Sequence, residues 1–155
     1  MKIAFQGLPT AQVMAAKIAG TDAYGQKIER HPLQEETYPC RHCLGPIAAG
    51  TDLLILAWKP FEATHAYTET GPIFLCGEDC KAAPPSDKAP DILRAPQYLV
   101  RGYSADERIV YGTGQVLATQ EIADYATQLL HDRGIAFVDV RSAANNCYQC
   151  RVRRA

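Results

Sequence analysis

The sequence CRHC at residues 40–43 opens a stretch that closes with CGEDC at residues 76–80. Between the two cysteine pairs lie an apolar run, LLILAW at residues 53–58, and a return segment, GPIFL at residues 71–75. A continuous apolar run of this length, without polar alternation, favours a strand that is covered on both faces. The run and its return therefore predict a hairpin whose two ends meet near the cysteines.

The four cysteines have the spacing of a metal site. Cys40 and Cys43 are spaced like a metal knuckle, and Cys76 and Cys80 form a second pair that is one residue longer. Zinc takes four thiolates from two short turns and arranges them in a tetrahedron. Gly45 follows the first pair, where a small residue lets backbone N–H groups turn toward the sulfurs. The spacing predicts a structural zinc site that clips the hairpin shut.

Other interpretations of these cysteines stay open at this stage. The four side chains could be reduced thiols packed near one another without a metal, or one pair could oxidise as a redox dithiol. His42 or His65 could replace a cysteine as a ligand, although a histidine in a polar loop is more often a surface residue.

Length and charge narrow the class of protein. The chain of 155 residues has the length of one domain, residues 1–155, and its net charge of −1 argues against a nucleic-acid partner held by a basic surface. No apolar run approaches the roughly 20 residues of a membrane span. Polar residues interrupt the apolar N-terminus, so we expect no cleaved signal peptide, a cytoplasmic protein and reduced thiols. The expected partner is a small molecule or a protein.

Apolar periodicity and turn residues predict an α+β fold, with a single domain, a mostly antiparallel sheet, two or three helices and the zinc-clipped hairpin. Helices are predicted at residues 10–20 and 119–133, with one further helical turn at Ile92 and Leu93. Strands are predicted at residues 2–7, 53–58, 73–75, 97–103, 108–111, 135–140 and 147–153. Residues 104–107 should form a hairpin turn between two of these strands.

The two predicted helices have apolar faces at helical spacing. The second helix has a face formed by Ile122, Tyr125, Ala126, Leu129 and Leu130, and Gly134 follows as a stop. The first has Ala11, Met14, Ala15 and Ile18 on one side, with Thr10 as a cap and Gly20 as a stop. We expect both faces to be buried and Leu129 to anchor the second.

A second CxxC motif, residues 147–150, lies in a strand pattern. Residues three apart in a strand point to opposite faces, so we expect one of Cys147 and Cys150 to be buried and the other exposed. A reactive Cys147 beside the Asn145-Asn146 turn is the alternative, and it would need a pKa lowered by a neighbour such as Arg141 or Arg151. Arg151 and Arg153 should share a solvated strand face.

Several short motifs in the chain resemble those of domain-of-unknown-function family 1203. They are PCRHC at residues 39–43, GPIFL at 71–75, RGY at 101–103 and NNCY at 145–148, with Arg151 and Arg153 after them. The resemblance runs from Phe5 to Arg154 and implies a single-domain bacterial protein, without implying an activity. Members of the family often have histidine where Cys76 stands, and usually glycine where Asn146 stands.

Two functions from different classes fit the sequence. The first is a binding or regulatory module with a purely structural zinc, because four thiolates leave no open coordination position for catalysis. The second is a small-molecule enzyme with a polar cleft near Asn145–Cys147. Its candidate ligand-site residues are Arg101, Arg141, Asn145, Asn146, Cys147 and Tyr148. The chain lacks a glycine-rich phosphate loop and an HExxH motif, which favours the binding module.

Overall fold

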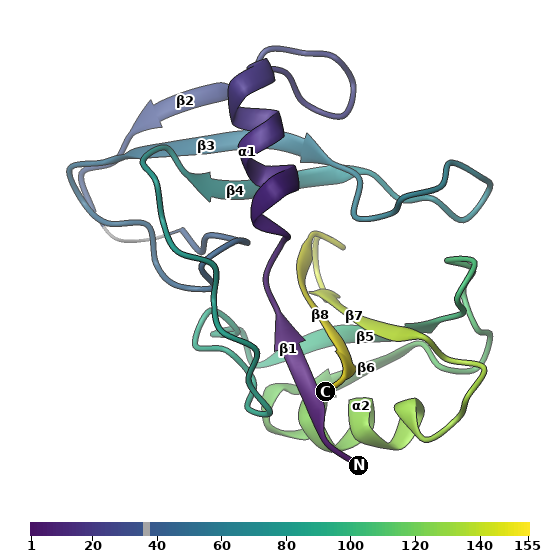
Figure 1. Ribbon diagram of the computed structural model, residues 1–155. Helices are drawn as coiled ribbons and strands as arrows, with labels where there is room; N and C mark the ends of the chain where they lie inside the picture. The colour runs from purple at the N-terminus through teal and green to yellow at the C-terminus, as the bar shows by residue number, and fades with distance from the viewer. Residues whose placement is uncertain (36–37) are drawn as a thin grey trace.

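Two antiparallel sheets and two α-helices make up the fold of the computed structural model, which describes residues 1–35 and 38–155 (Figure 1). In chain order the elements are β1 (Ile3–Gln6), α1 (Thr10–Ala19), β2 (Glu29–Pro32), β3 (Asp52–Trp58), β4 (Gly71–Cys76), β5 (Gln97–Tyr103), β6 (Gln115–Ala118), the 3-10 helix η1 (Thr119–Glu121), α2 (Ile122–Leu130), β7 (Phe137–Ser142) and β8 (Tyr148–Arg154). The prediction of a mostly antiparallel α+β protein with two helices is confirmed.

The two sheets lie one above the other in the view of Figure 1, each with its own helix. The five-stranded sheet has the order β1-β8-β7-β5-β6, and α2 packs against its β5, β7 and β8. The three-stranded sheet has the order β2-β3-β4, with α1 crossing it (Figure 1). Neither helix in the described part of the chain has the length and apolarity to cross a membrane.

The predicted hairpin is present as β3 and β4, which pair antiparallel along their whole length. Leu53 at the start of β3 lies opposite Cys76 at the end of β4, so the hairpin's open end carries a cysteine. Leu53, Leu54, Leu56 and Trp58 are all buried. The apolar run at residues 53–58 therefore forms a strand that is packed on both faces, as expected.

The weakly alternating residues after α1 gave no strand prediction, yet β2 lies there and pairs with β3. All four of its residues are exposed. β2 is an edge strand held by backbone hydrogen bonds rather than by apolar burial. Hydrophobic periodicity therefore carries no signal for it.

Helix α2 packs its apolar face into the larger of the two cores. Ile122, Ala126 and Leu130 are fully buried there, whereas Leu129 is only partly buried. Leu130, not Leu129, is the anchor of this face. The helix also ends earlier than predicted, at Leu130 instead of residue 133, because the chain turns through His131 before it reaches Gly134.

The prediction of which face of α1 is buried is wrong. Val13 is the buried residue of this helix, whereas Ile18 is 81% exposed and Met14 is 37% exposed. Alanine and other apolar residues stand on most sides of this short helix, so apolar spacing gave little contrast between faces. Gly20 does end the helix, in the left-handed conformation with φ 68° that glycine adopts readily.

The hairpin partner of β5 is β6, not residues 108–111. The predicted turn after Tyr103 exists, but the returning chain makes only an isolated bridge between Tyr103 and Ile109. Thr113 then inserts its hydroxyl between the segments and accepts the Gly102 N–H at 3.0 Å. This side chain replaces a ladder contact, so pairing resumes only at Gln115.

Candidate metal centre and adjoining cavities

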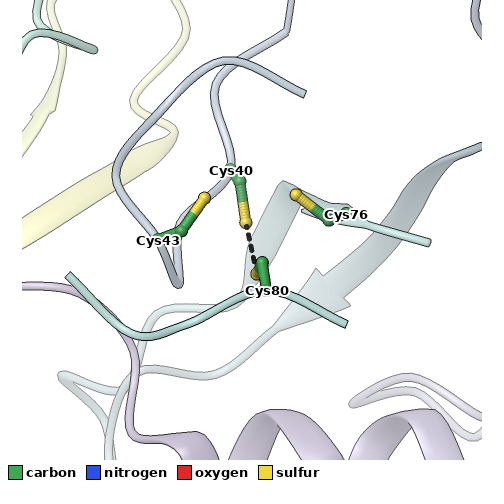
Figure 2. Close-up of side chains that lie close together, drawn as sticks. All are labelled: Cys40, Cys43, Cys76 and Cys80. Carbon is green, nitrogen blue, oxygen red and sulfur yellow. Dashed lines mark hydrogen bonds between the residues drawn. The ribbon is translucent and has the colours of Figure 1, made fainter. Parts of the chain in front are cut away.

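Four cysteine side chains converge at the open end of the β3–β4 hairpin (Figure 2). The sulfurs of Cys40, Cys43, Cys76 and Cys80 all lie within 4.8 Å of one another, and the Cys40 and Cys80 sulfurs are 3.9 Å apart. A tetrahedron with zinc–sulfur bonds of about 2.3 Å has sulfurs about 3.8 Å apart. The four thiols therefore fit a tetrahedral thiolate site.

The first pair is presented by a tight turn. The Cys40 N–H donates to the Gly45 carbonyl at 2.9 Å, and the Leu44 N–H donates back to the Cys40 carbonyl at 3.0 Å. Leu44 adopts the left-handed region, with φ 53°, which a non-glycine residue rarely does. The hydrogen bond with Cys40 raises the pKa of Cys43, and the Gly45 N–H, which lies at the Cys43 sulfur, opposes this rise only weakly. The turn thus aims backbone donors at the sulfurs, as the position of Gly45 predicted.

The second pair follows β4 directly. Cys76 is the last residue of the strand, and Cys80 stands in the loop beyond it. At this turn the Gly77 N–H donates to the Asp52 carbonyl at 2.7 Å. A Cβ at Gly77 would lie 2.7 Å from the Cβ of Asp52, so a larger residue would push the loop away.

Three further segments hold the turn of residues 40–45 in place. The Arg41 N–H donates to the Phe74 carbonyl of β4 at 3.0 Å, and the Leu8 N–H donates to the Arg41 carbonyl at 2.8 Å. The Ala83 N–H donates to the His42 carbonyl at 3.1 Å. Gly7 approaches this carbonyl so closely that an added Cβ would lie 2.2 Å from the oxygen. The cysteine cluster therefore links parts of the chain far apart in sequence.

The electrostatics of the cluster favour a bound cation. Hydrogen bonds from the thiols of Cys43 and Cys76 lower the pKa of Cys40, so its sulfur holds the negative charge. The same bond to Cys40 raises the pKa of Cys76, while burial is the main cause that raises the pKa of Cys80 to about 12. Without a cation, the sulfurs therefore share protons. A divalent metal would replace those protons and neutralise the charge.

His42 stands beside the cluster rather than in it. Its Nδ1 lies 3.2 Å from the Cys80 sulfur, and its Nε2 lies 2.9 Å from the Thr10 hydroxyl. A thiolate can only accept a hydrogen bond, so ligation by Cys80 requires the proton on Nδ1, and Thr10 then donates to Nε2. Such a partner orients a metal ligand and tunes its charge. Thr10, predicted as a helix cap, serves this bond and makes no capping bond.

His65 lies away from the cysteines. Its Nε2 is 3.1 Å from the Asp106 carbonyl, and its Nδ1 accepts the Tyr67 N–H at 3.1 Å. Both ring nitrogens are engaged in ordering a loop. The alternative in which His65 replaces a cysteine ligand finds no support in this geometry.

The predicted ligand-site residues gather mostly around one small polar cavity. Its volume is about 160 Å³, and its wall includes Arg141, Asn145, Asn146, Cys147 and Tyr148. Arg101 does not line this cavity, but Glu69, which does, forms ion pairs with both Arg101 and Arg141. Burial raises the pKa of Tyr103 to about 12, and its neutral hydroxyl donates to Glu69 at 3.2 Å. Sequence reasoning missed Glu69, which belongs to no predicted strand.

The second CxxC motif, residues 147–150, follows the turn between β7 and β8. Asn146 adopts the left-handed conformation, with φ 56°, which asparagine tolerates better than most residues. The Asn146 N–H donates to the Ser142 carbonyl at 2.9 Å, and the Arg141 guanidinium donates to the Asn146 carbonyl at 3.1 Å. Cys147 precedes β8 and is partly exposed, whereas Cys150 is fully buried. Cys150 is thus the buried thiol of the predicted pair, whereas Cys147 is only partly exposed instead of exposed.

The prediction that Arg151 lies on a solvated strand face is wrong. Arg151 pairs instead with a buried aspartate. Its Nε and Nη2 donate to the two carboxylate oxygens of Asp139 at 2.7 and 3.0 Å. Burial would lower the pKa of Arg151, but the charge of Asp139 outweighs this and raises it. Asp139 is the strand residue opposite Arg151 in the pairing of β7 with β8. A charged residue inside an otherwise apolar strand was the only available signal for Asp139.

A larger cavity of about 310 Å³ lies on the other side of Cys147. It is lined by residues of four separate segments: Tyr38, Pro39, Arg41 and Pro46; Phe74; Ile92, Arg94, Ala95 and Tyr98; Ser142, Asn145, Cys147 and Gln149. Arg41, between the two cysteines of the first pair, therefore forms part of its wall. No sequence pattern predicted this cavity.

The fold and the cluster together define a mostly antiparallel α+β protein with a candidate four-cysteine metal centre. A family model described as "protein of unknown function (DUF1203)" matches residues 37–154, and the chain belongs to this family. The match confirms the resemblance seen in the sequence, although it begins at residue 37 rather than at Phe5. No curated protein and no solved structure matches the chain.

Proposed function

We propose that the protein is a cytoplasmic, single-domain binding module whose four cysteines hold one structural zinc ion. The observation that carries this proposal is the mutual approach of four sulfurs within 4.8 Å, contributed by two turns at one hairpin end. Four thiolates complete the coordination of zinc, so no position stays open for a substrate or a catalytic water. The metal then acts through the shape it imposes on the surrounding chain.

Metal analysis tests the proposal directly. Protein purified without a chelator should contain about one zinc per chain. A Cys147→Ser variant, which changes a cysteine outside the cluster, should contain the same amount. Intact mass under denaturing conditions should show six free thiols once the metal is removed, matching the six cysteines of the chain. Metal-free protein with free thiols would contradict the zinc site, and a disulfide in one pair would point to the redox dithiol.

A second candidate function is a small-molecule enzyme at the Asn145–Cys147 turn. Cys147 stands outside the metal cluster and lines both adjoining cavities. On the side of the smaller cavity, Arg141 is buried, and its Nε has no hydrogen-bond partner within the part of the chain that the structure describes. A guanidinium donor beside a partly exposed thiol suits the binding of an anionic substrate next to a nucleophile.

Thiol labelling separates this candidate from a purely structural Cys147. Iodoacetamide added to native, zinc-loaded protein should modify Cys147 before any other cysteine, because metal protects the four clustered thiols and full burial protects Cys150. Mass spectrometry of peptides from early time points would identify the site, and Cys147→Ser should abolish the fast phase. Labelling of Cys147 only after unfolding would make it a core thiol and remove the nucleophile from the enzyme hypothesis.

A further inference from the structure

The cavity of about 310 Å³ beside Arg41 has an apolar wall and an unusual charge pattern. Just over half of its lining residues are aromatic, aliphatic or proline: Tyr38, Pro39, Pro46, Phe74, Ile92, Ala95 and Tyr98. The Tyr38 and Phe74 rings meet edge to face, with centroids 5.0 Å apart. Its lining within the described residues contains two arginines, Arg41 and Arg94, and no aspartate or glutamate. The cavity therefore combines an apolar body with excess positive charge.

Arg41 is the buried charge of this cavity, with a side chain that has almost no solvent contact. The residue is 2% exposed. Its Nε donates to the Tyr148 carbonyl at 2.7 Å and its Nη1 donates to the Pro39 carbonyl at 2.6 Å. Both acceptors are neutral, and they occupy two of the five N–H groups that a guanidinium carries. The guanidinium also lies over the Phe74 ring, 5.5 Å from its centroid.

Among the residues that the structure describes, no carboxylate forms an ion pair with Arg41. Arg141, the other arginine that is buried in the described part of the chain, does have an acidic partner, Glu69. Burying a charge without a counter-ion is costly. The cysteine cluster supplies negative charge on one side of Arg41, but it cannot fill the cavity on the other.

From this geometry we propose that the cavity binds a small carboxylate with an aromatic or branched apolar body. The carboxylate would accept from the free N–H groups of Arg41, a charge-assisted pairing that guanidinium geometry favours. The apolar body would lie between Phe74, Ile92 and Tyr98. The volume gives room for roughly ten heavy atoms, taking the about 30 Å³ that one water occupies in the liquid. This inference rests on the proposed zinc site, which holds Arg41 between two of its ligands.

An NMR titration of the zinc-loaded, ¹⁵N-labelled protein tests the inference with two matched probes. Phenylacetate carries the carboxylate, and phenylacetamide is its neutral counterpart of nearly equal shape. Phenylacetate should shift the amide signals of Arg41, Tyr98 and Cys147 in a saturable way. Phenylacetamide should bind at least tenfold more weakly, because it cannot form the charge-assisted pair. Equal affinity for the two probes, or no saturable shift with phenylacetate, would overturn the proposal.

Two variants test whether phenylacetate binds in the cavity beside Arg41. Arg41→Gln should raise the Kd of phenylacetate at least tenfold and leave that of phenylacetamide unchanged. Because this variant also removes buried hydrogen bonds, Ala95→Phe provides an independent test: it adds a ring at an exposed position of the cavity wall and should abolish binding of both probes. Phenylacetate binding that persists in both variants would overturn the proposal.

Zinc content measured on each NMR sample keeps this inference separate from the metal site. Full zinc without phenylacetate binding would overturn the carboxylate site and leave the zinc proposal standing. Folded, zinc-free protein that still binds phenylacetate in an Arg41-dependent way would support the carboxylate site and contradict the zinc proposal.

Discussion

Replacing Cys40 by serine should leave the protein largely unfolded at room temperature. Structural zinc contributes on the order of 10 kcal/mol to small modules, and domains of this size are stable by only about 5–15 kcal/mol in total. Cys40 is fully buried at the centre of the cluster, and its turn is held by β4, by the Leu8 segment and by Ala83. Loss of the metal would therefore release contacts across the three-stranded sheet.

Circular dichroism during thermal unfolding is the measurement for Cys40→Ser, with zinc content on the same preparation. Cys147→Ser is the matched control, since it changes a partly exposed thiol outside the cluster. It should retain its zinc and its melting temperature. A Cys40→Ser protein with the parent's melting curve would show that the four cysteines are reduced thiols packed near one another without a metal.

Asp139→Asn should cost about 3–5 kcal/mol of unfolding free energy. Asp139 is fully buried, and it accepts two hydrogen bonds from Arg151. The Arg141 Nη2 lies 4.0 Å from the same carboxylate. The amide keeps the shape but removes the negative charge, so a buried guanidinium loses its counter-ion. Its side-chain nitrogen would also face an arginine donor instead of accepting from it.

Urea unfolding of the variant and its parent would measure this cost. Glu29→Gln is the control, because its ion pair with His31 lies on the exposed edge strand β2. The control should change stability by less than about 0.5 kcal/mol. Similar losses in the two variants would mean that burial adds nothing to the Asp139–Arg151 pair.

Local spacing was enough to predict the centre of the fold. The apolar run before Trp58 and the glycine and proline before Ile73 define a hairpin without knowledge of distant residues. The pairing of Leu53 with Cys76 places the second cysteine pair at the end of the hairpin where β3 begins, and the Arg41 N–H holds the first pair there by donating to the Phe74 carbonyl. Contacts between segments far apart in the sequence could not be predicted from local patterns. Arg151 was assigned to solvent because its partner Asp139 is chosen by strand register, and the cavity beside Arg41 is assembled from four segments.

The pairing of β1 with β8 constrains when this protein can finish folding. Ile3 lies opposite Arg154 and Phe5 opposite Val152, so the first strand joins a sheet edge formed by the last (Figure 1). At about 5–20 residues per second, a ribosome needs on the order of ten seconds to make the intervening chain. During that interval Phe5, buried in the finished protein, has no sheet edge to join. Completion of the five-stranded sheet therefore waits until β8 has been synthesised and has left the ribosome, and contacts so distant in sequence close slowly.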